Sequence, residues 1–156
     1  MPDMLVRLYD LPDHTALVSA LAADGVEIRR VLPPEKRVLS AWVLEHFSPG
    51  WASECERALN NWPVSCFIAV DNGAILGFAC YDATCLGFFG PTGVSAAARG
   101  RGVGKALLWV TLRAMREHGY GYGVIGGVGP AEFYAKAVGA EIIADSTPGI
   151  YRGLVQ

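Results

Sequence analysis

The segment from Val94 to Leu108, VSAAARGRGVGKALL, joins an apolar, strand-like stretch to a helix through a glycine-rich loop. The glycines of the loop are Gly100, Gly102 and Gly104. Without side chains at alternate positions, several backbone N–H groups can turn toward one anion, and the start of the helix adds unpaired N–H groups and a positive dipole end. The cations around the loop are Arg99, Arg101 and Lys105. The segment therefore predicts a diphosphate site between a strand and a helix.

Two common diphosphate-binding motifs are excluded by residues that their chemistry requires. A Walker P-loop needs glycine at position 99 and Ser or Thr at position 106, whereas this chain has Arg99 and Ala106. A dinucleotide-binding fingerprint that began at Gly100 would need a third glycine at position 105, where Lys105 stands.

The loop resembles the acyl-CoA-binding motif of the GNAT superfamily of N-acyltransferases, which is written Arg/Gln-x-x-Gly-x-Gly/Ala. Arg99, Gly102 and Gly104 fill its three fixed positions, and Val94 matches the valine that usually ends the preceding strand. The alternative interpretation of the loop is a glycine-rich turn that only caps a helix.

A second motif, Pro130 to Ala140, resembles the other signature of this family, a short helix that carries tyrosine, lysine and then Gly-Phe or Gly-Ala. The matching residues are Tyr134, Lys136, Gly139 and Ala140. Gly127 stands where many members have an asparagine that contacts the cofactor, so side-chain contacts near the pantetheine arm differ here. The resemblance covers the C-terminal half closely and the N-terminal half only in the order of its elements.

The resemblance implies an α/β (α+β) GNAT fold, as a single domain over residues 1–156. Its central twisted sheet would be mixed, mostly antiparallel and about seven-stranded, with helices on both faces and with strands splayed near Val94 and Ile125. The sequence pattern favours strands at 5–8, 64–70, 75–81, 86–94, 120–125, 141–144 and 149–155, and helices at 13–23, 33–47, 48–60, 102–118 and 130–138. The segment 26–32 is ambiguous. Asp71-Asn72-Gly73 is a strong hairpin signal.

The resemblance also implies transfer of an acyl group, usually acetyl, from acetyl-CoA to a primary amine by direct attack in a ternary complex, and we expect the amine to belong to a small molecule. The backbone near Gly93 would pair with the pantetheine arm, and an N–H group there could hold the oxyanion. The residues expected to bind the cofactor are Gly93, Val94, Ser95, Arg99, Gly100, Arg101, Gly102, Val103, Gly104, Lys105 and Gly127.

Acyl transfer to an amine needs a general acid for the leaving thiolate and a base for the attacking ammonium. By analogy with the family, Tyr134 is the candidate acid, because a phenol pKa of about 10 is close to that of a thiol. Asp82 is the first candidate base and Glu132 the second, although either could be a solvated surface carboxylate. A base that acts through water would leave no sequence signature.

The acceptor site is expected in the N-terminal helices, where Trp42, His46, Phe47 and Trp51 form an aromatic-rich patch. Core packing explains much of this patch. As a pocket, it would suit a small apolar or aromatic amine. The nearby cations would equally suit an acceptor with a carboxylate, and both readings stay open; these cations are Arg29, Arg30, Lys36 and Arg37.

Composition excludes several other classes of protein. A net charge of −2 argues against a nucleic-acid partner, and no apolar run reaches the ~18 residues that span a membrane. The start lacks a basic-then-apolar secretion signal, so we expect a cytoplasmic protein. The four cysteines lack C-x-x-C spacing and the three histidines are scattered, so we expect reduced thiols and no metal site.

Two other functions share these motifs. One is a non-catalytic or sensory acyl-CoA-binding module, and the other is an acetyltransferase for protein N-termini or lysines. We leave open whether the chain forms a homodimer.

Overall fold

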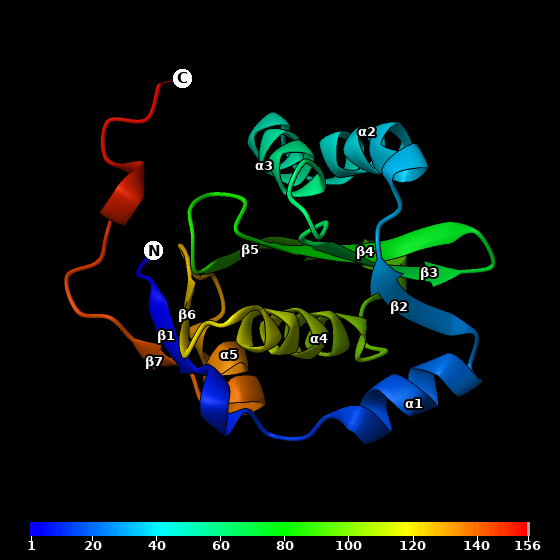
Figure 1. Ribbon diagram of the computed structural model, residues 1–156, viewed down its shortest axis with the longest axis horizontal. Coiled ribbons are helices and arrows are strands. Elements are labelled where there is room, and N and C mark those ends of the chain that lie inside the picture. The colour runs from blue at the N-terminus through cyan, green and yellow to red at the C-terminus, as the bar shows by residue number, and fades with distance from the viewer. Residues whose placement is uncertain (156) are drawn as a thin grey trace.

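A computed structural model describes residues 1–155 as a seven-stranded sheet in the order β2-β3-β4-β5-β6-β1-β7, with helices on both faces (Figure 1). The strands are β1 Met4–Arg7, β2 Val26–Arg30, β3 Cys66–Asp71, β4 Ala74–Tyr81, β5 Phe88–Val94, β6 Tyr122–Ile125 and β7 Glu141–Ile142. Neighbouring strands are antiparallel except β5 and β6, which are parallel. The sheet therefore has the mixed, mostly antiparallel character that the sequence predicts.

The helices are α1 Thr15–Ala23, α2 Lys36–His46, α3 Pro49–Leu59, α4 Val103–His118 and α5 Ala131–Val138. In Figure 1, α2 and α3 lie over one face of the sheet, and α1, α4 and α5 lie over the other. In residues 1–155, no helix combines the length and apolar character needed to cross a membrane.

Local signals in the sequence account for several element boundaries. Ser48 caps α3, because its Oγ accepts a hydrogen bond from the Trp51 N–H at 3.2 Å. Asn72 and Gly73 both have positive φ, at 49° and 80°, as a two-residue turn between antiparallel strands requires. Gly119 ends α4 with a φ of 117°.

Three sequence-based expectations change in the structure. The predicted strand at 149–155 is wrong: a short 3₁₀ helix, Gly149–Tyr151, occupies part of it, and Gly149 and Gly153 have positive φ, which breaks an extended strand. The ambiguous segment 26–32 contains β2, which supplies the seventh strand. The helix predicted at 33–47 begins with a 3₁₀ turn, Pro33–Glu35, before α2.

Two hydrophobic cores form, one on each face of the sheet. Alternate residues of β3 and β4 serve different cores: Cys66 and Phe78 pack with α2 and α3, whereas Phe67 and Ala79 belong to the core that contains α4. Leu107, Leu112 and neighbouring apolar side chains bury α4 against the sheet. Both faces of the central strands are therefore fixed by packing.

Candidate active site

The strands β5 and β6 separate after a short parallel contact. They pair only at Phe88↔Val124 and Phe89↔Ile125. β6 then ends at Ile125, while β5 continues to Val94 with only β4 beside it. Within residues 1–155, the other edge of β5 beyond Phe89 thus has no strand partner. This is the splay that the family resemblance implies.

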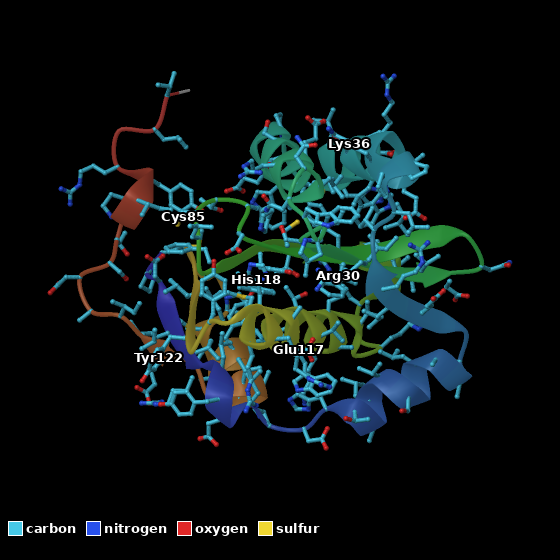
Figure 2. All side chains as sticks on the ribbon, viewed as in Figure 1. Arg30, Lys36, Cys85, Glu117, His118 and Tyr122 are labelled. Atoms are coloured by element: carbon cyan, nitrogen blue, oxygen red, sulfur yellow. The ribbon has the colours of Figure 1, made fainter. Side chains whose placement is uncertain are left out.

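A cavity of about 1310 Å³ opens at the splay. Its walls come from α3, the β4–β5 connection, the start of β5, the loop after β6, and the C-terminal segment. Cys85, labelled in Figure 2, lies on the β4–β5 connection where this connection faces the C-terminal segment. Lining side chains include Trp51, Glu54, Thr84, Phe88, Phe89, Tyr134 and Tyr151.

Tyr134 projects from α5 toward this cavity. The side chain is 8% exposed and belongs to the α4 core, yet it lines the cavity wall. Burial raises the pKa of its phenol above the ordinary value. The hydroxyl therefore stays protonated at neutral pH, as a proton donor must.

The glycine loop ends in a helix start that is free to bind an anion. Gly100 and Gly102 have φ values of 82° and 83°, a left-handed backbone that favours glycine. No side chain in residues 1–155 caps α4, and its first backbone bond runs from the Ala106 N–H to the Gly102 carbonyl at 3.0 Å. The preceding N–H groups of the helix are left without helical partners.

The cations of the loop differ in their surroundings. Arg99 and Arg101 are exposed, and Lys105 is half-buried. Arg101 Nη1 lies 3.9 Å from Asp71 Oδ2 of the β3–β4 hairpin. The carboxylate of Asp71 therefore partly neutralises the positive charge of Arg101.

The cavity lies along the first part of β5, and the glycine loop follows the end of the strand. Gly90 to Thr92 line the cavity, whereas the loop from Arg99 to Lys105 does not. Gly93, Val94 and Ser95 connect the two regions along the unpaired edge. An extended group laid along this edge would reach from the helix start to the cavity.

Gly127 lines the cavity just beyond β6. Its φ is +54°, and its N–H donates to Asp3 Oδ1 at 2.8 Å. That N–H group is therefore already engaged within the chain, and the position offers no side chain.

The two carboxylates predicted as candidate bases lie outside the cavity lining. Asp82 accepts hydrogen bonds from the Gly87 N–H at 2.8 Å and from the Tyr120 hydroxyl at 3.0 Å, and it organises the β4–β5 connection. Glu132 is exposed and pairs with Lys136 at 2.9 Å. A basic role for either one stays a prediction that this arrangement does not favour.

Glu54 is the carboxylate that the structure does bring to the cavity, among the described residues. It lies half-buried on α3, one turn after Trp51, and accepts a hydrogen bond from the Thr84 hydroxyl. Nothing in the sequence separates Glu54 from Glu56, which points to the surface and binds Ser40.

The aromatic patch packs mainly over β4. Trp42 and His46 stack with ring centroids 4.3 Å apart, and Phe47 contacts Phe78 with centroids 5.8 Å apart. Of the four predicted residues, only Trp51 lines the cavity. Core packing thus accounts for most of this patch.

The four cations near the patch do not line the cavity. Arg29 pairs with Glu35 at 2.6 Å. Figure 2 shows Arg30 and Lys36 on opposite sides of the sheet, and Lys36 Nζ donates to Asn60 Oδ1 at 3.2 Å. The exposed Arg37 completes this group. Their positions do not favour an acceptor carboxylate in the cavity.

Three cysteines distant in sequence meet in the core under α3. Cys55, Cys66 and Cys80 are fully buried, and their Sγ atoms all lie within 4.8 Å of one another. Burial raises the pKa of Cys66 and of Cys80, which keeps both thiols protonated. The spacing rule that predicted no metal site does not detect such a cluster, and the expectation that no metal binds stays a prediction.

Known structures share this fold. A glucosamine N-acetyltransferase region of a fungal multi-domain GH3 β-N-acetylglucosaminidase is 17% identical, with a TM-score of 0.75 over 91% of this chain and 19% of that one. A GCN5-related N-acetyltransferase from Sphaerobacter thermophilus is 20% identical, with a TM-score of 0.65 over 91% of this chain and 48% of that one. The chain thus spans less than half the length of either protein. No curated protein sequence matches it significantly.

The model of the acetyltransferase (GNAT) family matches residues 36–139, which is more than half of the chain and includes the glycine loop, the splay and Tyr134. The chain therefore belongs to the GNAT family of N-acetyltransferases, whose members typically use acetyl-CoA.

Proposed function

We propose that the protein transfers an acetyl group from acetyl-CoA to the primary amine of a small molecule in a ternary complex. One observation carries the proposal: the unpaired edge of β5 links an uncapped helix N-terminus to a cavity that Tyr134 lines. The helix start that could bind an anion thus lies at one end of the unpaired edge of β5, and the cavity lined by the phenol of Tyr134 lies toward the other end.

The residues of the loop suit the diphosphate of CoA. Backbone N–H groups at the start of α4 would bind the phosphate oxygens, with Arg99 and Lys105 adding charge. The edge at Gly93 to Ser95 would pair with the pantetheine amides, as an added strand does. Because Gly127 has no side chain and its N–H is bonded to Asp3, the cofactor contact expected at this position would be weaker here.

The chemistry requires the amine nitrogen to attack the thioester carbonyl, form the new C–N bond and break the C–S bond. A backbone N–H group of β5 would stabilise the developing oxyanion, and Tyr134 would donate its proton to the leaving thiolate. The proton of the amine goes to solvent or to a base that we do not assign.

The size and walls of the cavity support a small acceptor rather than a protein chain. The C-terminal segment, with Tyr151, forms one wall of the cavity. The four free cysteines suit a reducing compartment, so we keep the cytoplasm as the proposed location.

The test is CoA release from acetyl-CoA over a panel of amines, with product mass measured. We expect turnover with at least one small amine. CoA that binds without turnover on any amine would favour the non-catalytic module, and turnover only on peptides would favour the protein acetyltransferase.

Binding is tested separately by thermal stability. Acetyl-CoA at 100 times its Kd should stabilise the fold by about 2.7 kcal/mol. Stabilisation by ATP or NAD but not by acetyl-CoA would contradict the assignment of the loop.

A further inference from the structure

The two charged side chains that line the cavity, among the described residues, both come from α3. Glu54 is its only acidic lining residue in the described part of the chain, and its carboxylate is held in place by the Thr84 hydroxyl. Arg57, the cationic side chain of the lining, is exposed, and its Nη1 donates at 2.6 Å to Oδ1 of Asn61, which follows the end of α3. Glu54 is therefore the half-buried charged side chain of the lining, whereas Arg57 is exposed.

Tyr151 brings a third polar group to the same place. Burial raises the pKa of its phenol, and the negative charge of Glu54 contributes in the same direction, whereas a hydrogen bond with Thr84 opposes it. A Cβ built on Gly126 would stand 3.8 Å from the Tyr151 hydroxyl. The hydroxyl thus lies between α3 and the splay, where the acetyl group is expected.

The remaining walls of the cavity are mainly apolar. They come from α3, β5, the loop after β6 and the C-terminal segment; they include Trp51, Phe88, Phe89, Val128, Ile150 and Leu154. A ligand with a second charge would have to bury it against these side chains, which is unfavourable without a partner. An apolar ligand body gains by the same burial.

We propose that this cavity binds the acceptor as a monocation with an aromatic or aliphatic body, whose ammonium group is held by Glu54, Thr84 and Tyr151. The inference rests on the proposed function, because it identifies the bound amine as the acetyl acceptor. Binding of the amine can nevertheless be measured without acetyl transfer. Glu54 is a specificity-determining residue in this arrangement. It favours amines over neutral analogues and disfavours acceptors with a carboxylate.

The probe is 2-phenylethylamine, with 3-phenylpropanoate as an anion of similar shape and spermidine as a polycation. Each is titrated calorimetrically into the wild-type protein saturated with CoA, into Glu54→Gln, and into Glu56→Gln. Glu56 is the matched control, because it undergoes the same change on the same helix but lies outside the cavity.

We expect 2-phenylethylamine to bind the wild type and the Glu56→Gln variant equally, and Glu54→Gln about 10- to 100-fold more weakly, as for a lost hydrogen bond to a charged group. The anion should bind more weakly than the amine. Equal affinity in Glu54→Gln, tighter binding of the anion, or binding of spermidine alone would overturn the proposal.

The two proposals can fail separately. Glu54-dependent amine binding without any acetyl transfer would refute the proposed function and retain this site. Acetyl transfer to amines whose binding and turnover do not depend on Glu54 would retain the function and refute this site. Circular dichroism of both variants shows whether each one is folded.

Discussion

Gly102 lies against Leu17 of α1, so that a Cβ added at Gly102 would stand 2.9 Å from Leu17 Cδ1. Gly104, two residues on, has ordinary helical geometry, and a Cβ there would meet Val94 Cγ2 at 3.4 Å. Different constraints therefore act on Gly102 and Gly104, although both belong to one motif. A side chain at Gly102 would be disfavoured by the left-handed φ and by contact with Leu17 of α1. A Cβ at Gly104 would contact only Val94 of β5 within 4 Å.

Substitutions at the two glycines should therefore affect different properties, stability at Gly102 and CoA affinity at Gly104. Gly102→Ala should lose about 1–2 kcal/mol of stability, because its φ of 83° is left-handed. Gly104→Val should change stability little, since valine is no worse than glycine in a helix. It should weaken CoA about tenfold or more by blocking close approach to the N–H groups. Chemical denaturation and CoA titration measure the two effects. An unfolded Gly104→Val, or one with unchanged CoA affinity, would make Gly104 a packing residue.

Arg99 should contribute more to CoA binding than Arg101. Arg101 shares its charge with Asp71 at 3.9 Å, while Arg99 has no ion pair within the described residues. We expect Arg99→Ala to raise the Kd for CoA about tenfold at low salt, and Arg101→Ala to raise it less. Because exposed charges are screened, the Arg99 effect should shrink as salt increases. A loss that is equal for both variants and independent of salt would contradict this ranking.

Local signals predicted much of the fold, and long-range contacts account for what they missed. Ser48 and Asn72-Gly73 act on their own neighbours, so the sequence alone located a helix start and a hairpin. The segment 149–155 has the apolar content of a strand, but no neighbouring strand pairs with it, and two glycines turn it.

The residues of the candidate site also fall into those that local motifs predict and those that only the fold brings together. The loop and Tyr134 belong to continuous motifs and could be found in the sequence. Glu54 could not, because the cavity that distinguishes it from Glu56 is formed by α3 together with the C-terminal segment. The Cys55, Cys66 and Cys80 cluster likewise exists only once α3 packs on β3 and β4.

The carboxylate of Glu35 should make stability depend on pH. Arg29 donates to both of its oxygens, at 2.9 and 2.6 Å, and the Leu32 N–H donates at 2.8 Å. The hydrogen bond from Arg29 lowers the pKa of Glu35 below the ordinary 4.5. The stabilisation is therefore complete above about pH 4.5 and is lost as the pH falls through the lower folded pKa.

Glu35→Gln should accordingly lose stability at pH 7, by about 1 kcal/mol or less because the pair is partly solvated. The difference from wild type should close in acid. Glu27→Gln is the control, since Glu27 lies 3.9 Å from Arg29 and is mostly exposed. Denaturant unfolding at several pH values measures both. A Glu35→Gln deficit that persists unchanged in acid would mean that the loss is not ionic.

Cys85 should report on occupancy of the cavity. It is half-buried and lines the cavity, whereas the other three thiols are fully buried. Burial raises the pKa of Cys85, so its reaction with a disulfide reagent should be slow but measurable. It should still be faster than the reaction of the other three thiols. A ligand in the cavity should slow it further. Simultaneous reaction of all four thiols in the native protein would contradict this burial pattern.

Tyr134 allows the chemical and packing roles of one side chain to be separated. Tyr134→Phe removes a hydroxyl and keeps the ring in its core. If the phenol protonates the leaving thiolate, kcat should fall by about 10²-fold, while stability and CoA affinity hardly change. Because burial raises the pKa of Tyr134, the phenol stays protonated beyond about pH 10. The ratio of wild-type to variant kcat should therefore be constant between about pH 6 and 9.

A second readout ties that loss to the leaving group. An acyl donor with a more acidic thiol needs less help from an acid, so the kcat deficit of Tyr134→Phe should be smaller with that donor. Phe133→Leu is a control, because Phe133 is an exposed neighbour outside the cavity lining. A Tyr134→Phe variant with normal kcat would leave Tyr134 as an aromatic wall of the cavity. One with weaker CoA binding at unchanged kcat would make the hydroxyl a ligand contact, because a proton donor acts on the transition state and leaves ground-state affinity intact.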